Sequence, residues 1–235
     1  PAAKVNWSQK LETTLAPLKL PLDPKAKDQR ATKRTEAELA KPRPVEFSKV
    51  IPFRENGKNK LAASSFHGDV MLFDETGAKL GGWRVPAGIS DLAAADLDGD
   101  GQVEFLLGCQ DAKLRAVKTD GRELWSRDFE FYRIYPDVTI VQTADLDNDG
   151  KPEILAGCDN WKLYAFDRDG KERWNYGVVH PVRRVQVADL DGDGKVEIVA
   201  GTRYMWITVL DANGKKRWGT KFGIGCRATA APLNG

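Results

Sequence analysis

The 235-residue sequence is poor in cysteine and histidine and has no long apolar run. Its three cysteines, Cys109, Cys158 and Cys226, are too few and too odd in number for a disulfide framework. No stretch approaches the ~18 consecutive apolar residues of a membrane-spanning helix, so we expect no membrane span. The two histidines, His67 and His180, stand apart, and no nucleophile with a nearby base is recognisable, so no catalytic residue is assigned. Helical periodicity is absent from residue 47 onward, which excludes a helical architecture there.

A repeated acidic segment organises the rest of the sequence. Three segments align without gaps: DLDGDGQVEFLLG (residues 96–108), DLDNDGKPEILAG (145–157) and DLDGDGKVEIVAG (189–201). A degenerate copy, PFRENGKNKLAAS, covers residues 52–64. The glycine at the sixth position recurs every 44 to 49 residues, at Gly57, Gly101, Gly150 and Gly194. This period matches a four-stranded propeller blade of about 40–50 residues.

A second segment recurs between the acidic ones, as AVKTDGRELW (116–125), AFDRDGKERW (165–174) and VLDANGKKRW (209–218). An Asp-Gly or Asn-Gly pair between apolar runs predicts a β-hairpin. One unit therefore contains four strands, near residues 184–189, 197–201, 207–211 and 215–220. We predict an all-β fold, a β-propeller fragment of about four four-stranded blades. The recurring tryptophans, Trp125, Trp174 and Trp218, are expected to pack between blades.

Each acidic loop places carboxylates at positions 1, 3, 5 and 9. Four carboxylates within nine residues repel one another unless a cation lies among them, and oxygen-only ligands favour a hard ion such as Ca²⁺. Gly at position 6 allows a sharp turn, and position 7 would offer its backbone carbonyl. Three calcium sites are expected, with these ligands: Asp96, Asp98, Asp100, Gln102 and Glu104; Asp145, Asp147, Asp149, Lys151 and Glu153; and Asp189, Asp191, Asp193, Lys195 and Glu197.

An EF-hand loop also opens with DxDxDG, but its closing acid stands at position 12 and helices flank it. Here the acid is at position 9, which argues against an EF-hand. The alternative of solvated acidic turns without metal stays open. In the degenerate copy the four ligand positions hold Pro52, Arg54, Asn56 and Lys60, so that blade is expected to be free of metal.

The DLDGDGxxEIxxG units resemble FG-GAP/VCBS-type repeats, as in integrin-α-like propellers, and the AFDRDGKERW-type units resemble the repeats of pyrroloquinoline-quinone-like propellers. The resemblance covers roughly residues 47–235. It implies a ring of seven or eight blades, calcium at the hairpin between strands one and two, and a secreted, periplasmic or cell-surface location. It does not fix a ligand.

The sequence divides into three segments. Residues 1–11 read as the end of a preceding blade, and residues 12–46 as a charged, proline-containing insertion or linker. Residues 47–235 hold the propeller blades, with units near 47–90, 91–138, 139–183 and 184–227, and a next unit truncated at 235. The remaining blades of a parent chain are therefore expected partners.

The connections opposite the acidic hairpins are rich in aromatic and basic residues, and loops on a rigid scaffold are where ligands commonly bind. The candidate ligand-binding residues are Trp161, Tyr204, Trp206, Tyr132, Arg133, Tyr135, His180, Arg183, Arg184 and Arg203. The alternative is that these aromatics pack under their own loops.

The charge distribution bears on the partner. The net charge is +2, but twelve of the 34 acidic residues lie in the three loops, which leaves 22 acidic residues against 36 basic ones elsewhere. Outside one linker, no compact basic cluster with interleaved aromatics is present, which argues against nucleic acid. We expect a non-catalytic extracellular calcium-binding module that binds a glycan or protein; the alternative is the scaffold of a polysaccharide-degrading enzyme such as a lyase.

Overall fold

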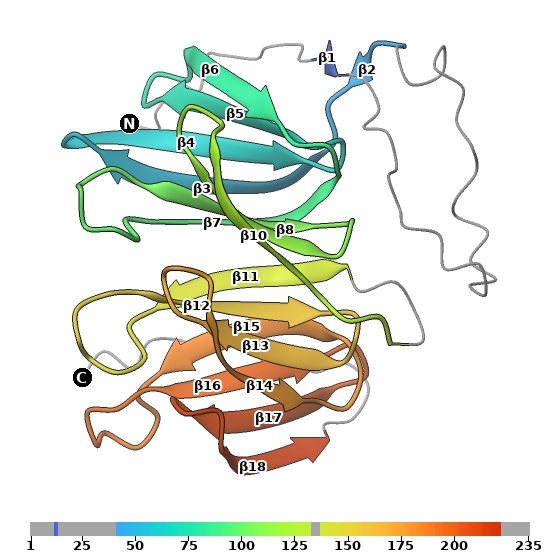
Figure 1. Cartoon of the computed structure of the whole chain (residues 1–235), viewed down its shortest axis with the longest axis vertical. Coiled ribbons are helices and arrows are strands. Elements are labelled where there is room, and N and C mark those ends of the chain that lie inside the picture. The colour runs from blue at the N-terminus through green and yellow to red at the C-terminus, as the bar shows by residue number, and fades with distance from the viewer. Residues whose placement is uncertain (1–11, 14–40, 133–136, 222–235) are drawn as a thin grey trace, which may run out of the picture.

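The computed structural model describes residues 12–13, 41–132 and 137–221, and everything below concerns these residues. Their regular structure consists of strands only, arranged as four four-stranded sheets and one two-stranded sheet (Figure 1). The prediction of an all-β fold with four four-stranded units is confirmed. The described residues contain no helix long and apolar enough to cross a membrane.

The four large sheets follow one another along the chain. The first contains β3 (Phe47–Glu55), β4 (Lys58–Ser65), β5 (Asp69–Asp74) and β6 (Lys79–Arg84). The second contains β7 (Ile89–Ala95), β8 (Glu104–Cys109), β9 (Lys113–Lys118) and β10 (Glu123–Asp128). The third contains β11 (Val138–Ala144), β12 (Glu153–Cys158), β13 (Lys162–Phe166) and β14 (Glu172–Gly177). The fourth contains β15 (Val182–Ala188), β16 (Glu197–Thr202), β17 (Trp206–Asp211) and β18 (Lys216–Lys221).

Each large sheet is an antiparallel meander in which every strand pairs with its neighbour in sequence. The turns between strands one and two and between strands three and four therefore lie at one end of every sheet, on the left in Figure 1. The turns between strands two and three, and the connections between sheets, lie at the other end. The acidic loops and the aromatic connections consequently occupy opposite faces, which we call the hairpin face and the loop face.

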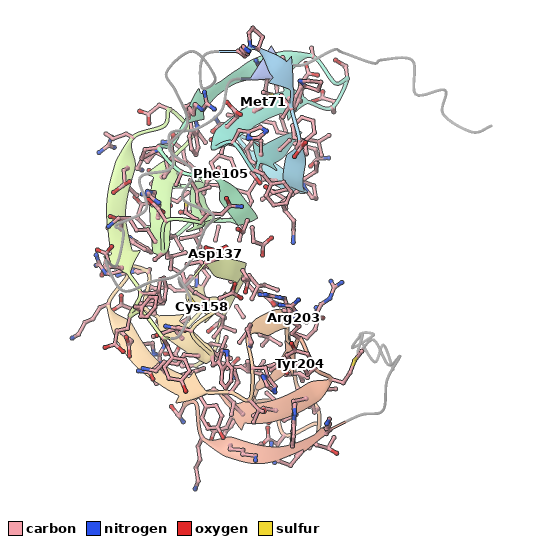
Figure 2. All side chains as sticks on the ribbon, turned by 90° about the vertical axis from the view of Figure 1, so that its right-hand side faces the viewer. Met71, Phe105, Asp137, Cys158, Arg203 and Tyr204 are labelled. Atoms are coloured by element: carbon pink, nitrogen blue, oxygen red, sulfur yellow. The ribbon has the colours of Figure 1, made fainter. Side chains whose placement is uncertain are left out.

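The sheets stack side by side through their first strands, because β3 contacts β7, β7 contacts β11, and β11 contacts β15. Figure 2 shows the result as an arc of sheets. In the second and third sheets the second strand is the most buried one, because every residue of β8 and β12 is buried. Apolar clusters fill the spaces between successive sheets, with Phe105 in the first and Ile154 in the second.

Asp91 on β7 adds a polar contact to this stack. Its carboxylate is buried, accepts a hydrogen bond from the Val141 backbone N–H at 2.9 Å and lies 2.9 Å from the Lys49 ammonium. One side chain therefore joins three successive sheets through their innermost strands.

The recurring tryptophans bind neighbouring sheets at their outer edges. The Trp125 ring lies over Gly170 of the next sheet, and the Trp174 ring lies over Gly214 of the sheet after it. Trp174 also donates a hydrogen bond from Nε1 to the Ala212 carbonyl at 3.0 Å. The expected packing of tryptophans between units is confirmed at these two positions, and Trp83 makes the same contact with Gly121.

A small sheet precedes the four large ones. It pairs β1 (Glu12–Thr13) with β2 (Arg43–Pro44), so the two ends of the predicted 12–46 insertion lie side by side. The predicted end of a preceding blade, residues 1–11, lies outside the described residues, as does the truncated unit near residue 235.

Candidate functional site

Each acidic loop is folded by the carboxylate at its first position. Asp96 accepts hydrogen bonds from the backbone N–H groups of Gly99 at 2.7 Å and Gly101 at 2.9 Å. Asp189 makes the same two contacts with Gly192 and Gly194, and Asp145 accepts from Gly150. The glycine at position 6 has a φ near +82° in all three loops, a conformation that glycine adopts without steric cost.

The acid at position 9 comes from the start of the buried second strand. In the second sheet, Glu104 Oε2 accepts a hydrogen bond from the Leu97 N–H at 2.9 Å, which leaves Oε1 directed at the loop. The equivalent bonds join Glu153 to Leu146 and Glu197 to Leu190, both at 2.8 Å. All three glutamates are buried. Oε1 of Glu104 is also buried, and its one ion-pair partner among the described residues is the Lys118 ammonium at 3.2 Å.

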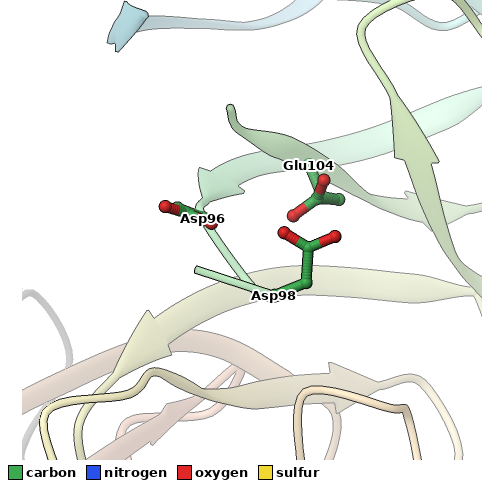
Figure 3. Close-up of side chains that lie close together, drawn as sticks. All are labelled: Asp96, Asp98 and Glu104. Atoms are coloured by element: carbon green, nitrogen blue, oxygen red, sulfur yellow. The ribbon is translucent and has the colours of Figure 1, made fainter. Parts of the chain in front are cut away.

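Carboxylates from positions 1, 3 and 9 converge in every loop. One oxygen from each of the three residues lies within 4.8 Å of the others, and the groups are Asp96, Asp98 and Glu104; Asp145, Asp147 and Glu153; and Asp189, Asp191 and Glu197. Figure 3 shows the first group, with the carboxylates of Asp98 and Glu104 facing each other. Two oxygens bound to one Ca²⁺ at 2.3–2.6 Å lie at most about 5 Å apart. The spacing and the all-oxygen donor set therefore fit Ca²⁺.

The acids at position 5 are not part of these groups. Asp100, Asp149 and Asp193 each accept a hydrogen bond at 2.8 Å from the backbone N–H at position 7. These bonds use the backbone N–H groups of Gln102, Lys151 and Lys195, whereas the predicted calcium ligands at position 7 are the backbone carbonyls.

A basic side chain of the protein itself lies on every acidic group, which the sequence did not predict. In the second sheet, the Lys118 ammonium is 3.3 Å from Asp98 and 3.2 Å from Glu104. In the third sheet, one nitrogen of Arg173 contacts Asp147 at 2.9 Å and Glu153 at 2.8 Å. In the fourth, Arg217 contacts both Asp191 and Glu197.

These contacts and the burial of the glutamates shift the titration of the loop residues. Burial raises the pKa of Glu153, in spite of the Leu146 N–H and the Arg173 charge. The hydrogen bond from Arg217 lowers the pKa of Asp191. The backbone N–H of Gln102 and the ammonium of Lys118 lower the pKa of Asp100. Each loop contains four carboxylic side chains and fewer basic ones, and this excess of acidic groups favours a further cation.

For two of these basic residues, the repeated tryptophan segment contains a recognisable sequence signal. Arg173 and Arg217 immediately precede the recurring tryptophans, in the segments KERW and KKRW. The second sheet has Leu124 at this position, and Lys118 from the third strand takes the place instead. The degenerate loop differs altogether: β3 and β4 are joined by a tight turn of Asn56 and Gly57, both with positive φ.

On the loop face, four of the predicted ligand residues form one row of rings. The ring centroids of Tyr132 and Trp161 are 5.6 Å apart, those of Trp161 and His180 4.9 Å, and those of His180 and Tyr204 4.5 Å. The Arg203 guanidinium lies 5.9 Å from the Tyr204 ring. Figure 2 looks onto this face, where Arg203 and Tyr204 are labelled.

The other predicted ligand residues lie apart from the row. Arg183 forms an ion pair of 2.6 Å with Asp159, Arg184 is exposed on β15, and the Trp206 ring has the Lys221 ammonium 5.9 Å from its centroid. Arg133 and Tyr135 lie outside the described residues.

This arrangement of four-stranded sheets is similar to that of known proteins. A family model described as FG-GAP-like repeat matches residues 145–200, which contain the second and third acidic loops. BBS1N in complex with ARL6DN matches with a TM-score of 0.58 and 13% identity, over 74% of this chain and 54% of that one. Sqt1 of Saccharomyces cerevisiae matches with a TM-score of 0.61 and 11% identity, over 80% of this chain and 54% of that one. The four sheets are blades of a β-propeller.

The predicted β-propeller fold is thereby confirmed, and the resemblance to FG-GAP repeats is supported over residues 145–200. At these identities the similarity to solved structures concerns the fold alone, and the chain spans about half the length of the propeller structures that it matches. No curated protein matches the sequence.

Proposed function

We propose that this chain forms a calcium-binding β-propeller module that binds a ligand through its loop face. The observation that carries the proposal is the threefold repetition of one oxygen-rich group at the same corner of successive blades. A single acidic turn on a protein surface is common without a metal, whereas three in register, each ending in a buried glutamate, are not expected from chance.

The chain's own groups would hold the ion in a definite way. Position 1 is fixed by two backbone N–H groups, position 9 is fixed by the backbone N–H of position 2, and position 3 closes the group from the exposed side. When bound, Ca²⁺ supplies positive charge that offsets carboxylate repulsion. It would also tie the loop to the second strand of the blade, and a ligand present at ~100 times its dissociation constant adds about 2.7 kcal/mol of stability.

The composition of the acidic loops favours a modest affinity for Ca²⁺. Two of the three carboxylates in the second-sheet group are not buried, and a basic side chain of the protein competes for the same oxygens in every loop. Calcium sites of extracellular modules bind in the ~10⁻⁴–10⁻³ M range. Sites of that strength are filled only where calcium is millimolar, which supports a secreted, periplasmic or cell-surface location.

The loop face supports the binding part of the proposal. The row of aromatic rings lies on this face, at the end of the blades opposite the acidic loops. Exposed aromatic residues are enriched at interaction sites. BBS1N, a structure of the same fold, was solved in complex with a protein, ARL6DN. A protein or glycan ligand on this face is accordingly the function that we propose.

Isothermal titration of the protein with CaCl₂ tests the proposal. We expect three sites that prefer Ca²⁺ to Mg²⁺, and the variant Asp147→Asn should lose one of them while leaving the other two. Asp128→Asn removes an exposed carboxylate outside the loops and should leave all three. Absence of calcium uptake, or a stoichiometry that Asp147→Asn does not change, would contradict the proposal.

A further inference from the structure

The row of rings on the loop face joins four separate connections of the chain. Tyr132 follows β10, Trp161 lies in the turn between β12 and β13, His180 lies between β14 and β15, and Tyr204 lies in the turn between β16 and β17. The interplanar angles are 65°, 60° and 66°, so neighbouring rings meet edge to face. The row therefore spans three blades, and its two ends, Tyr132 and Tyr204, are exposed.

The backbone beneath the row adopts a conformation that its residues disfavour. The turn between strands two and three has three residues in every blade, and the third has a positive φ each time: Gly68, Ala112, Trp161 and Met205. The first two blades fill this position with small residues. The third blade fills it with tryptophan, and His180 beside it also has a positive φ, of 76°. Bulky residues rarely adopt this conformation, and such strain is concentrated at functional sites.

A cavity opens beside Trp161 at the outer end of the row. Its volume is ≈ 390 Å³. Its lining includes the apolar and aromatic side chains of Phe131, Tyr132, Trp161 and Val178 and the charged side chains of Glu130 and Lys162. This volume is near the lower limit of small-molecule pockets, which is about 300 Å³. The cavity thus accommodates one large apolar side chain of a partner.

The opposite end of the row carries positive charge. Arg203 is exposed beside Tyr204 and makes no ion pair with any residue that the structure describes. The acidic loops, with twelve of the 34 acidic residues, lie on the far face of the blades. Two acidic residues beside the row, Glu130 and Asp159, are paired with Lys162 and Arg183. The Arg203 guanidinium has no such pair among the described residues, which favours a carboxylate of the partner.

We propose that the loop face binds an extended, acidic segment of a partner protein, which inserts one bulky apolar side chain beside Trp161 and places a carboxylate at Arg203. This proposal rests on the ligand-binding function proposed above. The three steps between ring centroids, each close to 5 Å, are covered by roughly five residues of extended chain at ~3.3 Å per residue.

The same geometry disfavours a glycan. A sugar ring stacks on the open face of an aromatic ring, whereas Trp161 and His180 each meet ring neighbours on two sides. The apolar part of the cavity, formed by Phe131, Trp161 and Val178, also matches an aliphatic or aromatic side chain better than a hydroxyl-rich sugar, because burying unpaired hydroxyl groups is costly.

Selection from a phage-displayed library of short random peptides, followed by fluorescence anisotropy of the enriched peptides, tests the proposal. We expect enriched sequences that share one bulky apolar residue followed a few positions later by Asp or Glu. Trp161→Gly should weaken their binding by about 30-fold or more, as expected for a hot-spot aromatic. Arg203→Gln should weaken binding of the acidic peptides, and should do so less at high salt.

Ala112→Gly is the matched control, because it relieves the same positive φ in the neighbouring blade without removing a ring. It should leave binding unchanged, and both glycine variants should keep cooperative thermal unfolding. The proposal is overturned if the enriched peptides lack acidic residues, if Trp161→Gly binds them as the parent protein does, or if only acidic oligosaccharides on an array bind this face. Calcium titration separates the two proposals: if the protein takes up calcium but its peptide binding does not depend on Trp161, only the peptide-docking proposal is refuted.

Discussion

Replacing Gly170 by alanine should break the contact between the second and third blades. Gly170 lies in the turn between β13 and β14 with a φ of +74°, under the ring of Trp125. A Cβ atom built there would lie 2.8 Å from the ring carbons, closer than two carbon atoms approach. The ring or the turn must therefore move. If the turn moves, the Gly170 carbonyl moves with it, and this carbonyl accepts a hydrogen bond from Arg127.

Two effects add in this variant. Holding an alanine in the left-handed region costs about 1–2 kcal/mol, and forcing extra volume into a packed contact costs about 1–3 kcal/mol more. Gly57→Ala isolates the first effect, because Gly57 has the same φ of +74° and no atom within 4 Å of the added Cβ. Gly170→Ala should therefore lower the free energy of unfolding by roughly 2–5 kcal/mol, and Gly57→Ala should lower it by about 1–2 kcal/mol.

Urea unfolding followed by tryptophan fluorescence measures this difference. With a denaturant slope of about 2 kcal/mol per molar, Gly170→Ala should unfold at a midpoint about 1 M below that of Gly57→Ala. Equal midpoints for the two variants would show that the tryptophan contact does not hold the blades together, and the reasoning would be refuted.

Further predictions concern the blade edge, the loop cations and the thiols. Trp174→Ala should lower the unfolding free energy by about 3–5 kcal/mol, whereas Trp218→Ala, which removes a half-exposed ring, should lower it by less than about 1 in urea titrations. Arg173→Gln should tighten calcium binding in the third blade by roughly 2- to 5-fold in calorimetry, because a competing cation is removed, while Arg168→Gln, an exposed arginine, should not. Burial raises the pKa of the Cys109 thiol to about 12, so at pH 8 it should react with a disulfide reagent only after unfolding.

Each of these predictions has a clear contrary outcome. Equal losses for the two tryptophan variants would mean that Trp174 contributes nothing beyond its own turn. Unchanged calcium affinity in Arg173→Gln would mean that its guanidinium does not compete with the ion. Rapid labelling of Cys109 in the native protein would show that the strand carrying it opens.

The architecture was readable from the sequence because its signals are local. The acidic loop, the Asp-Gly turn and the tryptophan each recur at fixed spacing, and each specifies its own turn or strand. The number of turns in one repeat predicts four strands per blade. Stacking of the blades follows separately, because each unit buries its apolar face only against the next unit. The burial of Glu104 was not predicted, although its position is the first residue of the buried second strand.

The contacts of long side chains across the blade could not be predicted in this way. Lys118 and Arg173 reach equivalent acidic groups from different strands, so no single sequence position marks the cation. The row of rings likewise depends on how far one blade is rotated against the next. Neither the neighbours of Trp161 nor its positive φ is encoded by a local pattern, because a glycine would be the usual residue there.

A crystal structure of the protein grown in CaCl₂, with an anomalous difference map, tests the central claim most directly. The account predicts a peak in each of the three acidic loops, about 2.3–2.6 Å from oxygens of positions 1, 3 and 9, and none at the Asn56–Gly57 turn. Lys118, Arg173 and Arg217 should have turned away from the carboxylates. Loops without anomalous peaks, with the three basic side chains still on Glu104, Glu153 and Glu197, would contradict it.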